Sequence, residues 1–421
     1  MLNDAYRAGF LPIDAQFVFH ERGRLEGTVN MLGRRHWIVT ALALGALGVV
    51  GLGCGKKTEG SGGDAAAANE WKVGAYLSLS GAETGFGTST KEGIELAMEE
   101  VNAKGGVKGK KIKMIFEDDK SNPQEASNKV LQLIDRDKVV ALLGEVASSR
   151  SKAGGIVANK KKIPMITPSS TNPDVTQVGP FVFRVCFTDD VQGQMGARFV
   201  AEKLNKKKVA ILYASDDLYS SGLANEFRTE AKKLGLEIVI EKSFLKNETN
   251  FTTYLNEIKG ANPEMIYAPV YYNAMVPVAR QAKATGLSGS MFIGGDGWHD
   301  ESLVDGAGEE MEGAYFTNHY SPDMPSENSR AFVKKYSDRF KHEPSSLAAQ
   351  GYDAALLLAD AIGRAKSDTP EAIRDAIAET KGFQGATGAI TINEQRNADK
   401  PIVVVQIKGK KFTYFDTIGK K

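Results

Sequence analysis

Hydroxyl side chains and one acid recur in short loops that follow strongly apolar segments. Ser148 follows the run VVALLGE, Ser169 and Thr171 follow IPMITP, and Asp296 lies in the loop GGDGW after the run SMFI. Such loops offer hydroxyls, backbone N–H groups, aromatic rings and a carboxylate. These groups hold a small polar ligand by hydrogen bonds without transforming it. If the loops meet in space, the sequence therefore predicts a site for such a ligand.

Each of these residues also has a structural explanation. Ser148 begins a predicted helix over 148–161, where unpaired N–H groups and the positive end of the helix dipole suit a carboxylate. It could equally be a simple helix cap, and the two roles are compatible. Ser169 and Thr171 could form a turn around the neighbouring prolines, and Asp296 could belong to an Asp-Gly turn with a solvated carboxylate.

The sequence lacks the motifs of common catalytic and nucleotide-binding sites. It contains no G-x-x-x-x-G-K-[ST], no G-x-S-x-G, no H-E-x-x-H and no pair of C-x-x-C. Ser148 and Ser149 could act as nucleophiles only beside a base, and no sequence argument places a histidine there. We interpret all five histidines as surface or packing residues: His20, His36, His299, His319 and His342. We therefore predict a binding protein rather than an enzyme, with neither a cofactor nor a metal.

Strand-like and helical segments alternate from Trp71 onward. Extended apolar runs such as WKVGAYLSL alternate with segments whose apolar residues recur at helical spacing. The alternation restarts at residue 207, and single helices between strands imply parallel crossovers. The pattern predicts an α/β protein with two doubly wound parallel-sheet lobes. Helices over 327–340, 347–365 and 370–380 and further strands complete the chain. In such sheets ligands bind beyond the carboxyl ends of the strands, where the polar loops lie.

The same patterns predict the boundaries of individual elements near these loops. A helix is expected over 89–104 after a Gly-rich turn, and another over 222–235 after a loop that contains Tyr219. A strand is expected over 264–272, so that Tyr271 lies at its end.

Composition excludes several classes of protein. The chain has 421 residues, 42% of them hydrophobic and 25% charged, which is ordinary globular composition. A net charge of +1 gives no general attraction to nucleic acid. Two cysteines cannot form a disulfide framework or a cysteine-based zinc site. Cys186 lies in the apolar run FVFRVCF, and we expect a buried, inert thiol.

The first 54 residues indicate export. Residues 37–53 carry no charge and follow Arg34 and Arg35, as in a secretory signal, and the run ends just before Cys54. The sequence GLGC resembles the lipobox of bacterial lipoproteins, which implies cleavage before Cys54 and a diacylglycerol on its thiol. The alternative is an uncleaved N-terminal anchor helix. Either way we expect the rest of the chain to face outward, tethered to a membrane, in the periplasm or on the outer face of the cytoplasmic membrane.

The segments around the signal have separate predicted fates. Residues 1–30 are mixed and polar, unlike a signal, so we expect translation to start at Met31 and the signal to span 31–53. Residues 54–70 are rich in Gly and Ala and read as a flexible, lipid-anchored tether. Cleavage before Cys54 leaves 48 basic and 48 acidic residues, a neutral chain.

From residue 71 to the end, the chain resembles the leucine/isoleucine/valine-binding proteins, the receptors of branched-chain amino acid ABC importers. The resemblance rests on the runs YLSLSGAETGFGTSTKEGIELAMEEVNAKGG, ALLGEVASSRSKAGGIVANKKKIPMITPSSTNPDVT, FIGGDGW and GFQGATGAITINE. It implies a type I periplasmic-binding-protein fold whose lobes are joined by a hinge that crosses three times. Lobe 1 would comprise 71–188 and 319–397, and lobe 2 would comprise 189–318 and 398–421.

The resemblance also implies roles for particular residues. Ser148, Ser169 and Thr171 match positions that bind the ligand carboxylate and ammonium, and Asp296 matches the acid that pairs with the ammonium. Asp stands here where the best-known members have Glu. Four further positions match residues that border the ligand: Tyr219, Tyr271, Phe86 and Leu347. For the two tyrosines, packing in the core or on a lobe surface is the alternative. Trp298 could line the same site or pack into the hinge.

The resemblance implies capture of an amino acid by closure of the lobes, with branched-chain or aliphatic ligands favoured. The partners would be the free amino acid and the permease subunits of an ABC importer, with no nucleic acid, and the receptor would be a monomer. The same fold also serves amide sensors and receptor ectodomains. An amino-acid- or amide-sensing protein with a separate signalling partner is therefore the alternative.

Overall fold

The computed structural model describes residues 70–419, all within one structural unit. The predicted N-terminal extension, signal peptide, lipid-anchored Cys54 and tether up to residue 69 lie outside these residues. Among the helices that the structure describes, none combines the length and the apolar character needed to cross a membrane.

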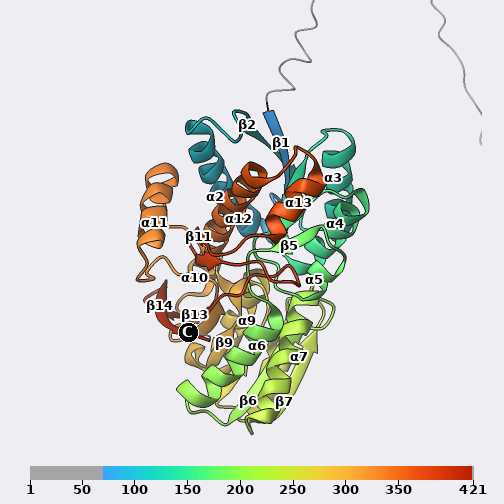
Figure 1. The fold of residues 1–421 in the computed structure, drawn as a ribbon. Helices are drawn as coiled ribbons and strands as arrows, with labels where there is room; N and C mark the ends of the chain where they lie inside the picture. Colours follow the sequence, from blue (N-terminus) through green and yellow to red (C-terminus); the bar gives the residue numbers. More distant parts are fainter. Residues whose placement is uncertain (1–69, 420–421) are drawn as a thin grey trace, which may run out of the picture. The chain divides into compact units, whose positions relative to one another are not determined.

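A five-stranded parallel sheet forms the core of the first lobe (Figure 1). Its strands, in the order β2-β1-β3-β4-β5, are β1 Glu70–Leu77, β2 Lys111–Asp118, β3 Ala141–Gly144, β4 Met165–Thr167 and β5 Val182–Arg184. The helices between them are α2 Thr84–Ala103, α3 Pro123–Asp135, α4 Ser148–Lys161 and the short α5 Asp174–Gln177. All four residues of β3 are buried, as expected for a central strand covered on both faces.

A seven-stranded sheet forms the second lobe. Its strands, in the order β14-β13-β10-β9-β8-β6-β7, are β6 Lys208–Ala214, β7 Glu237–Phe244, β8 Met265–Tyr267, β9 Phe292–Gly294, β10 Tyr315–Asn318, β13 Ile402–Lys408 and β14 Lys411–Ile418. Five strands are parallel, and β13 and β14 add an antiparallel edge. The helices are α6 Asp189–Arg198, which continues into a π-helical turn at Phe199–Lys203, α7 Leu218–Lys233, α8 Thr252–Gly260, α9 Tyr272–Thr285 and α10 Glu301–Ala307.

After β10 the chain returns to the first lobe. This part comprises α11 Glu327–Phe340, α12 Ser346–Arg364, α13 Pro370–Ala378 and the hairpin of β11 Phe383–Gly385 and β12 Gly388–Ile390. Helix α12 lies along α2 at very close range. A Cβ atom added to Gly93 of α2 would lie 2.0 Å from the carbonyl oxygen of Ala348 in α12. The chain therefore passes between the lobes three times: after β5, after β10 and before β13 (Figure 1).

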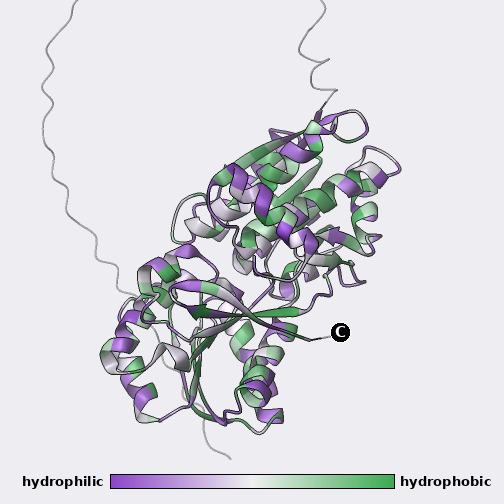
Figure 2. Ribbon diagram, turned by 90° about the vertical axis from the view of Figure 1, so that its left-hand side faces the viewer, coloured by the Kyte–Doolittle hydropathy of each residue, from purple (hydrophilic) through white to green (hydrophobic). Residues whose placement is uncertain are grey.

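Each lobe buries its own apolar layer. Figure 2 shows hydrophobic strands enclosed by helices that carry polar residues on their outer faces. Leu143 and Ile166 in the first sheet and Ile211 and Ile266 in the second are fully buried. The α/β class with two wound sheets, predicted from the alternating segments, is confirmed.

Three predicted boundaries near the cleft are wrong, and each has a physical reason. Helix α2 begins at Thr84, not at residue 89, because Gly87 lets the first turn pack against the carbonyl of Ser78, 2.0 Å from an added Cβ. Helix α7 begins at Leu218, because the Asp217 side chain caps it by accepting from the N–H of Ser220. The strand expected over 264–272 ends at Tyr267, and Tyr272, the last residue of the expected strand, is the first residue of α9.

Candidate functional site

A small cavity lies between the two lobes, at the carboxyl ends of their strands. Helices α2, α4 and α12 of the first lobe and the start of α7, the residue before α9 and the loop after β9 in the second lobe form its walls. Its lining residues are Phe86, Val146, Ser148, Ser169, Thr171, Tyr219, Tyr271, Asp296, Gly297 and Leu347. The structure thus brings together all eight side chains that the sequence predicts to contact a ligand.

Ser148 forms the first-lobe wall together with the start of α4. It is the first residue of the helix, whereas the capping position belongs to Ala147, whose side chain makes no capping bond. The Ser148 hydroxyl accepts from the backbone N–H of Asn172 at 3.2 Å. Ser148 is therefore not a side-chain cap for its own helix. The N–H groups in the first turn of α4 lack acceptors within the helix, which makes this end suitable for an anion.

The loop after β4 supplies the other hydroxyls of this wall. The Ser169 hydroxyl reaches the carbonyl of Val146 at 3.4 Å, a long hydrogen bond. The Thr171 hydroxyl is buried and has no hydrogen-bond partner among the described residues. A buried hydroxyl without a partner carries a desolvation penalty that a bound ligand can remove.

Arg184, a residue that sequence reasoning missed, holds this loop in place. Its fully buried guanidinium donates to the carbonyls of Ser170 at 2.5 Å and Asn172 at 2.8 Å, and its Nε donates to Asn397 at 2.7 Å. Burial lowers the pKa of this arginine, but from a value so high that it stays charged. An arginine at the end of an apolar strand was a usable signal, because such a charge must find partners when it is buried.

Asp296 lies on the second-lobe wall, in a single 3₁₀ turn after β9, and only 6% of its surface is exposed. The Tyr219 hydroxyl donates to Asp296 Oδ1 at 3.0 Å and accepts from the N–H of Gly297 at 3.0 Å. His319 Nε2 lies 3.1 Å from Asp296 Oδ2. One tyrosine and one histidine therefore orient the carboxylate toward the cavity.

The histidine beside Asp296 is neutral. Its ring is completely buried and stacks on Phe187 with centroids 3.7 Å apart, and burial lowers the pKa of His319. The neutral ring must then carry its proton on Nε2 to donate to the carboxylate. The ring therefore offers Asp296 a hydrogen bond but no positive charge. His319 lies directly after β10, a strand that sequence reasoning missed; it is a packing residue, as predicted, and its ring also reaches Asp296.

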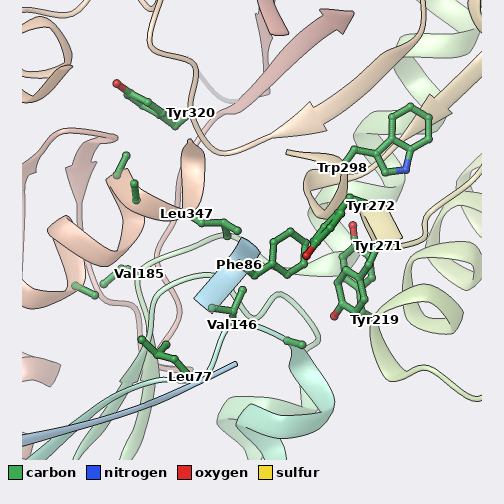
Figure 3. Packing of buried hydrophobic residues seen from close by; sticks show 14 of the residues in the cluster. Leu77, Phe86, Val146, Val185, Tyr219, Tyr271, Tyr272, Trp298, Tyr320 and Leu347 are labelled. Carbon is green, nitrogen blue, oxygen red and sulfur yellow. The ribbon is translucent and has the colours of Figure 1, made fainter. Parts of the chain in front are cut away.

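Aromatic and aliphatic side chains close the remaining sides of the cavity. Tyr219 and Tyr271 stack nearly parallel at 4.6 Å, and Phe86 meets the edge of Tyr271 at 5.5 Å. Figure 3 shows Phe86 between these tyrosines and Leu347, with Val146 beneath it. This half of the cavity is apolar, which suits a hydrocarbon side chain.

Two further side chains lie apart from the cavity. Trp298 is buried in the second lobe, where its indole N–H donates to the carbonyl of Ala268 at 3.2 Å, and it does not line the cavity. Cys186 is buried, and burial raises the pKa of its thiol to about 12, so the prediction of a buried, inert thiol is confirmed. Among residues 70–419, no cluster of His, Cys, Asp and Glu could hold a metal ion.

The fold and the cavity define a two-lobed solute-binding protein with its site between the lobes. Residues 70–411 match the family described as periplasmic binding protein, and the chain belongs to that family. Members of this family are substrate-binding receptors, and the family places the folded part of the chain outside the cytoplasm.

Individual relatives sharpen this assignment. The chain is 31% identical to an amino acid binding protein of Pseudomonas aeruginosa over 69% of this chain and 77% of that protein. It resembles the leucine-binding protein LivK of Thermotoga maritima at 36% identity with a TM-score of 0.78, over 82% of this chain and 98% of that one. It also resembles LivJ of Streptococcus pneumoniae, a branched-chain amino acid transporter substrate-binding protein solved with isoleucine. There the identity is 32%, the TM-score 0.78, and the coverage 82% and 99%. The resemblance to branched-chain amino acid receptors is confirmed.

Proposed function

We propose that this protein captures a free amino acid with an aliphatic side chain between its lobes and delivers it to the permease subunits of an ABC importer. The observation that carries the proposal is the buried carboxylate of Asp296, which faces the cavity and whose two hydrogen-bond partners are both neutral. A buried carboxylate of this kind is stabilised by a cationic ligand group, and the ammonium of an amino acid supplies it.

The opposite wall offers a matching site for the ligand carboxylate. The first turn of α4 at Ser148 provides N–H groups and the positive end of a helix dipole, and Thr171 provides a hydroxyl that lacks a partner among the described residues. An amino acid that spans the cavity would thus contact both lobes with its two charged groups. Its side chain would lie against Phe86 and Leu347. The Thermotoga maritima protein is a leucine-binding protein and the Streptococcus pneumoniae protein was solved with isoleucine, in agreement with this chemistry.

Ligand capture would proceed by closure of the lobes. Because the ligand contacts Ser148 in one lobe and Asp296 in the other, it favours the closed form over the open one. No group in the cavity is arranged as a nucleophile with its base, since the Ser148 hydroxyl accepts from a backbone N–H. We therefore propose that the protein binds its ligand without turnover. We also propose that it is a monomer, anchored to the membrane through a lipid on Cys54.

A thermal-shift screen of the purified protein against the twenty amino acids, acetamide and benzoate tests this proposal. Leucine, isoleucine or valine at 100 times its dissociation constant should stabilise the protein by about 2.7 kcal/mol. Benzoate lacks the ammonium and should give no shift, because it would place a second anion beside Asp296. Stabilisation by acetamide or benzoate alone, or by no compound, would contradict the proposal.

A further inference from the structure

A buried arginine gathers three acids next to the cleft, outside the ligand cavity. The side chain of Arg150, in the first turn of α4, is completely buried. Its Nη1 donates to Glu83 at 2.6 Å, and its Nε lies 3.0 Å from Glu145 and 4.0 Å from Asp119. All three acids belong to the first lobe, and all are buried.

Within the first lobe this cluster holds more acids than basic groups. Burial and the nearby charge of Glu145 raise the pKa of Asp119 to about 8, which favours its protonated form at neutral pH. Glu83 and Glu145 then share the single positive charge of Arg150, and Glu145 also accepts from the N–H of Ala147 at 2.6 Å. Three buried acids thus surround one arginine, and Glu83 is the acid that lies at the surface that meets the second lobe.

The second lobe supplies a further positive charge. Lys246, in the loop after β7, places its Nζ 3.2 Å from Glu83 Oε1, and the side-chain amide of Asn273 in α9 donates to the same oxygen at 3.3 Å. Lys246 also lies 3.7 Å from Asp217 of its own lobe and 5.6 Å above the ring of Tyr271. In the closed form Lys246 therefore bridges an acid from each lobe.

The same contact is coupled to the ligand cavity on both sides. Glu83 directly precedes α2, whose first turn carries Phe86, and the N–H of Gly85 donates to the Tyr272 hydroxyl across the cleft at 3.2 Å. On the second lobe, the ring beneath Lys246 is Tyr271, which lines the cavity. Opening the cleft would expose Glu83 at the same time as it exposes these aromatic rings.

We propose that Glu83, Lys246 and Asn273 form an inter-lobe latch that holds the closed, ligand-bound form and sets how slowly the ligand leaves. The latch rests on the proposed function, because it needs a ligand-driven closure to act upon. None of its residues lines the ligand cavity, so these are positioning residues that act on the closure equilibrium. The latch contacts exist only when the lobes meet, so their loss should appear in dissociation rather than in association.

The test compares Lys246→Met with Lys242→Met in the full-length protein. Both lysine side chains are about one-third exposed, but Lys242 pairs with Glu257 inside the second lobe. We expect Lys246→Met to weaken binding of the amino acid found in the screen by about 10-fold, chiefly through faster dissociation in stopped-flow measurements. Lys242→Met should leave both rates unchanged. The melting temperature without ligand should stay near that of the wild type in both variants.

A charge-conserving variant and a double-mutant cycle separate a latch from simple packing. Lys246→Arg should keep most of the wild-type affinity for the amino acid. The double variant Glu83→Gln/Lys246→Met should lose less binding free energy than the sum of the losses in the two single variants. If Glu83→Gln does not fold, because it removes the buried ion pair between Glu83 and Arg150, Asn273→Ala takes its place in the cycle. If Lys246→Met released the amino acid at the wild-type rate, the latch would be overturned, whereas the receptor function would still be supported by ligand binding to the wild type. A wild type that binds no amino acid would instead overturn the receptor function itself.

Discussion

At the scale of single residues, Asp296 is the charge on which ligand recognition depends. Its two oxygens are held by Tyr219 and by the neutral ring of His319, so its charge is oriented but not cancelled. A buried carboxylate in this state gains most from an ammonium group, because low polarity strengthens the attraction and few other partners compete.

Replacing Asp296 should therefore weaken binding strongly. We expect Asp296→Ala to reduce the affinity for the amino acid by about 10-fold or more, since the ligand ammonium would be buried without its partner. Isothermal titration calorimetry measures this change. Asp300→Asn is the matched control, because Asp300 is also buried nearby but caps α10, and the amide oxygen can still accept from the N–H of Ser302. Equal affinities for Asp296→Ala and the wild type would contradict the assignment.

The cavity-lining side chains were largely predictable from the sequence, whereas the groups that support them were not. Ser148, Thr171 and Asp296 follow apolar strand-like runs, and parallel sheets bring such positions to one edge. Arg184 and His319 act through other residues, and their partners lie far away in the sequence. The position of Arg184 at the end of an apolar strand signals that a buried charge needs partners, but the local pattern names no partner for either residue, because packing alone decides which groups they meet.

At the scale of elements, segments with a strong pattern were predicted well and segments defined by tertiary contacts were not. Helix α11 has the predicted ends, since amphipathic spacing determines them locally. Helix α2 starts five residues early because its first turn packs on β1, and β10 was missed because its four residues lie between irregular segments. These outcomes depend on neighbours that a linear pattern does not show.

The close contact between α2 and α12 gives a test at this scale. An added methyl group at Gly93 would lie 2.0 Å from the backbone oxygen of Ala348, so the two helices must separate. We expect Gly93→Ala to lower the free energy of unfolding by about 2 kcal/mol or more, as measured by urea denaturation.

Gly363 in α12 is the matched control for this substitution. An added Cβ there would meet Val107 at an ordinary contact distance of 3.6 Å. Because alanine restricts the unfolded chain and favours a helix, Gly363→Ala should leave stability unchanged or raise it by up to about 1 kcal/mol. If the two variants showed the same change, close helix packing would not be the cause.

At the scale of the whole molecule, export and anchoring depend on residues outside the described range. If Cys54 carries the lipid, Cys54→Ala should lose all incorporation of labelled palmitate in cells, and the intact mass of the wild type should correspond to a chain that begins at Cys54. Cys186→Ala should keep the label, because that thiol is buried in the folded receptor. A label that persists in Cys54→Ala, or a mature chain with any residue before Cys54, would contradict lipid anchoring there.

The junction of the two lobes also makes stability depend on pH. His299 of the second lobe is buried, and its Nδ1 accepts from the backbone N–H of Ser346 in the first lobe at 3.2 Å. Burial lowers the pKa of His299 to about 3, whereas a histidine in the unfolded chain titrates near 6.5. The unfolded chain therefore takes up a proton that the folded protein excludes, so this contribution is fully present above pH 6.5 and is lost as the pH falls from 6.5 toward 3.

Between pH 7 and pH 5 this single group should reduce the free energy of unfolding by about 2 kcal/mol. Urea denaturation at the two pH values measures the loss in the wild type, to which other titrating groups also contribute. His299→Gln cannot take up the proton, and its side-chain oxygen can replace the acceptor, so its loss should be smaller than that of the wild type by the same amount. His342→Gln is the control for the loss of an imidazole as such, because the His342 side chain is 40% exposed and lies beside Glu92 within the first lobe, away from the lobe junction. If His299→Gln and the wild type lost equal stability, His299 would not be the buried neutral group that joins the lobes.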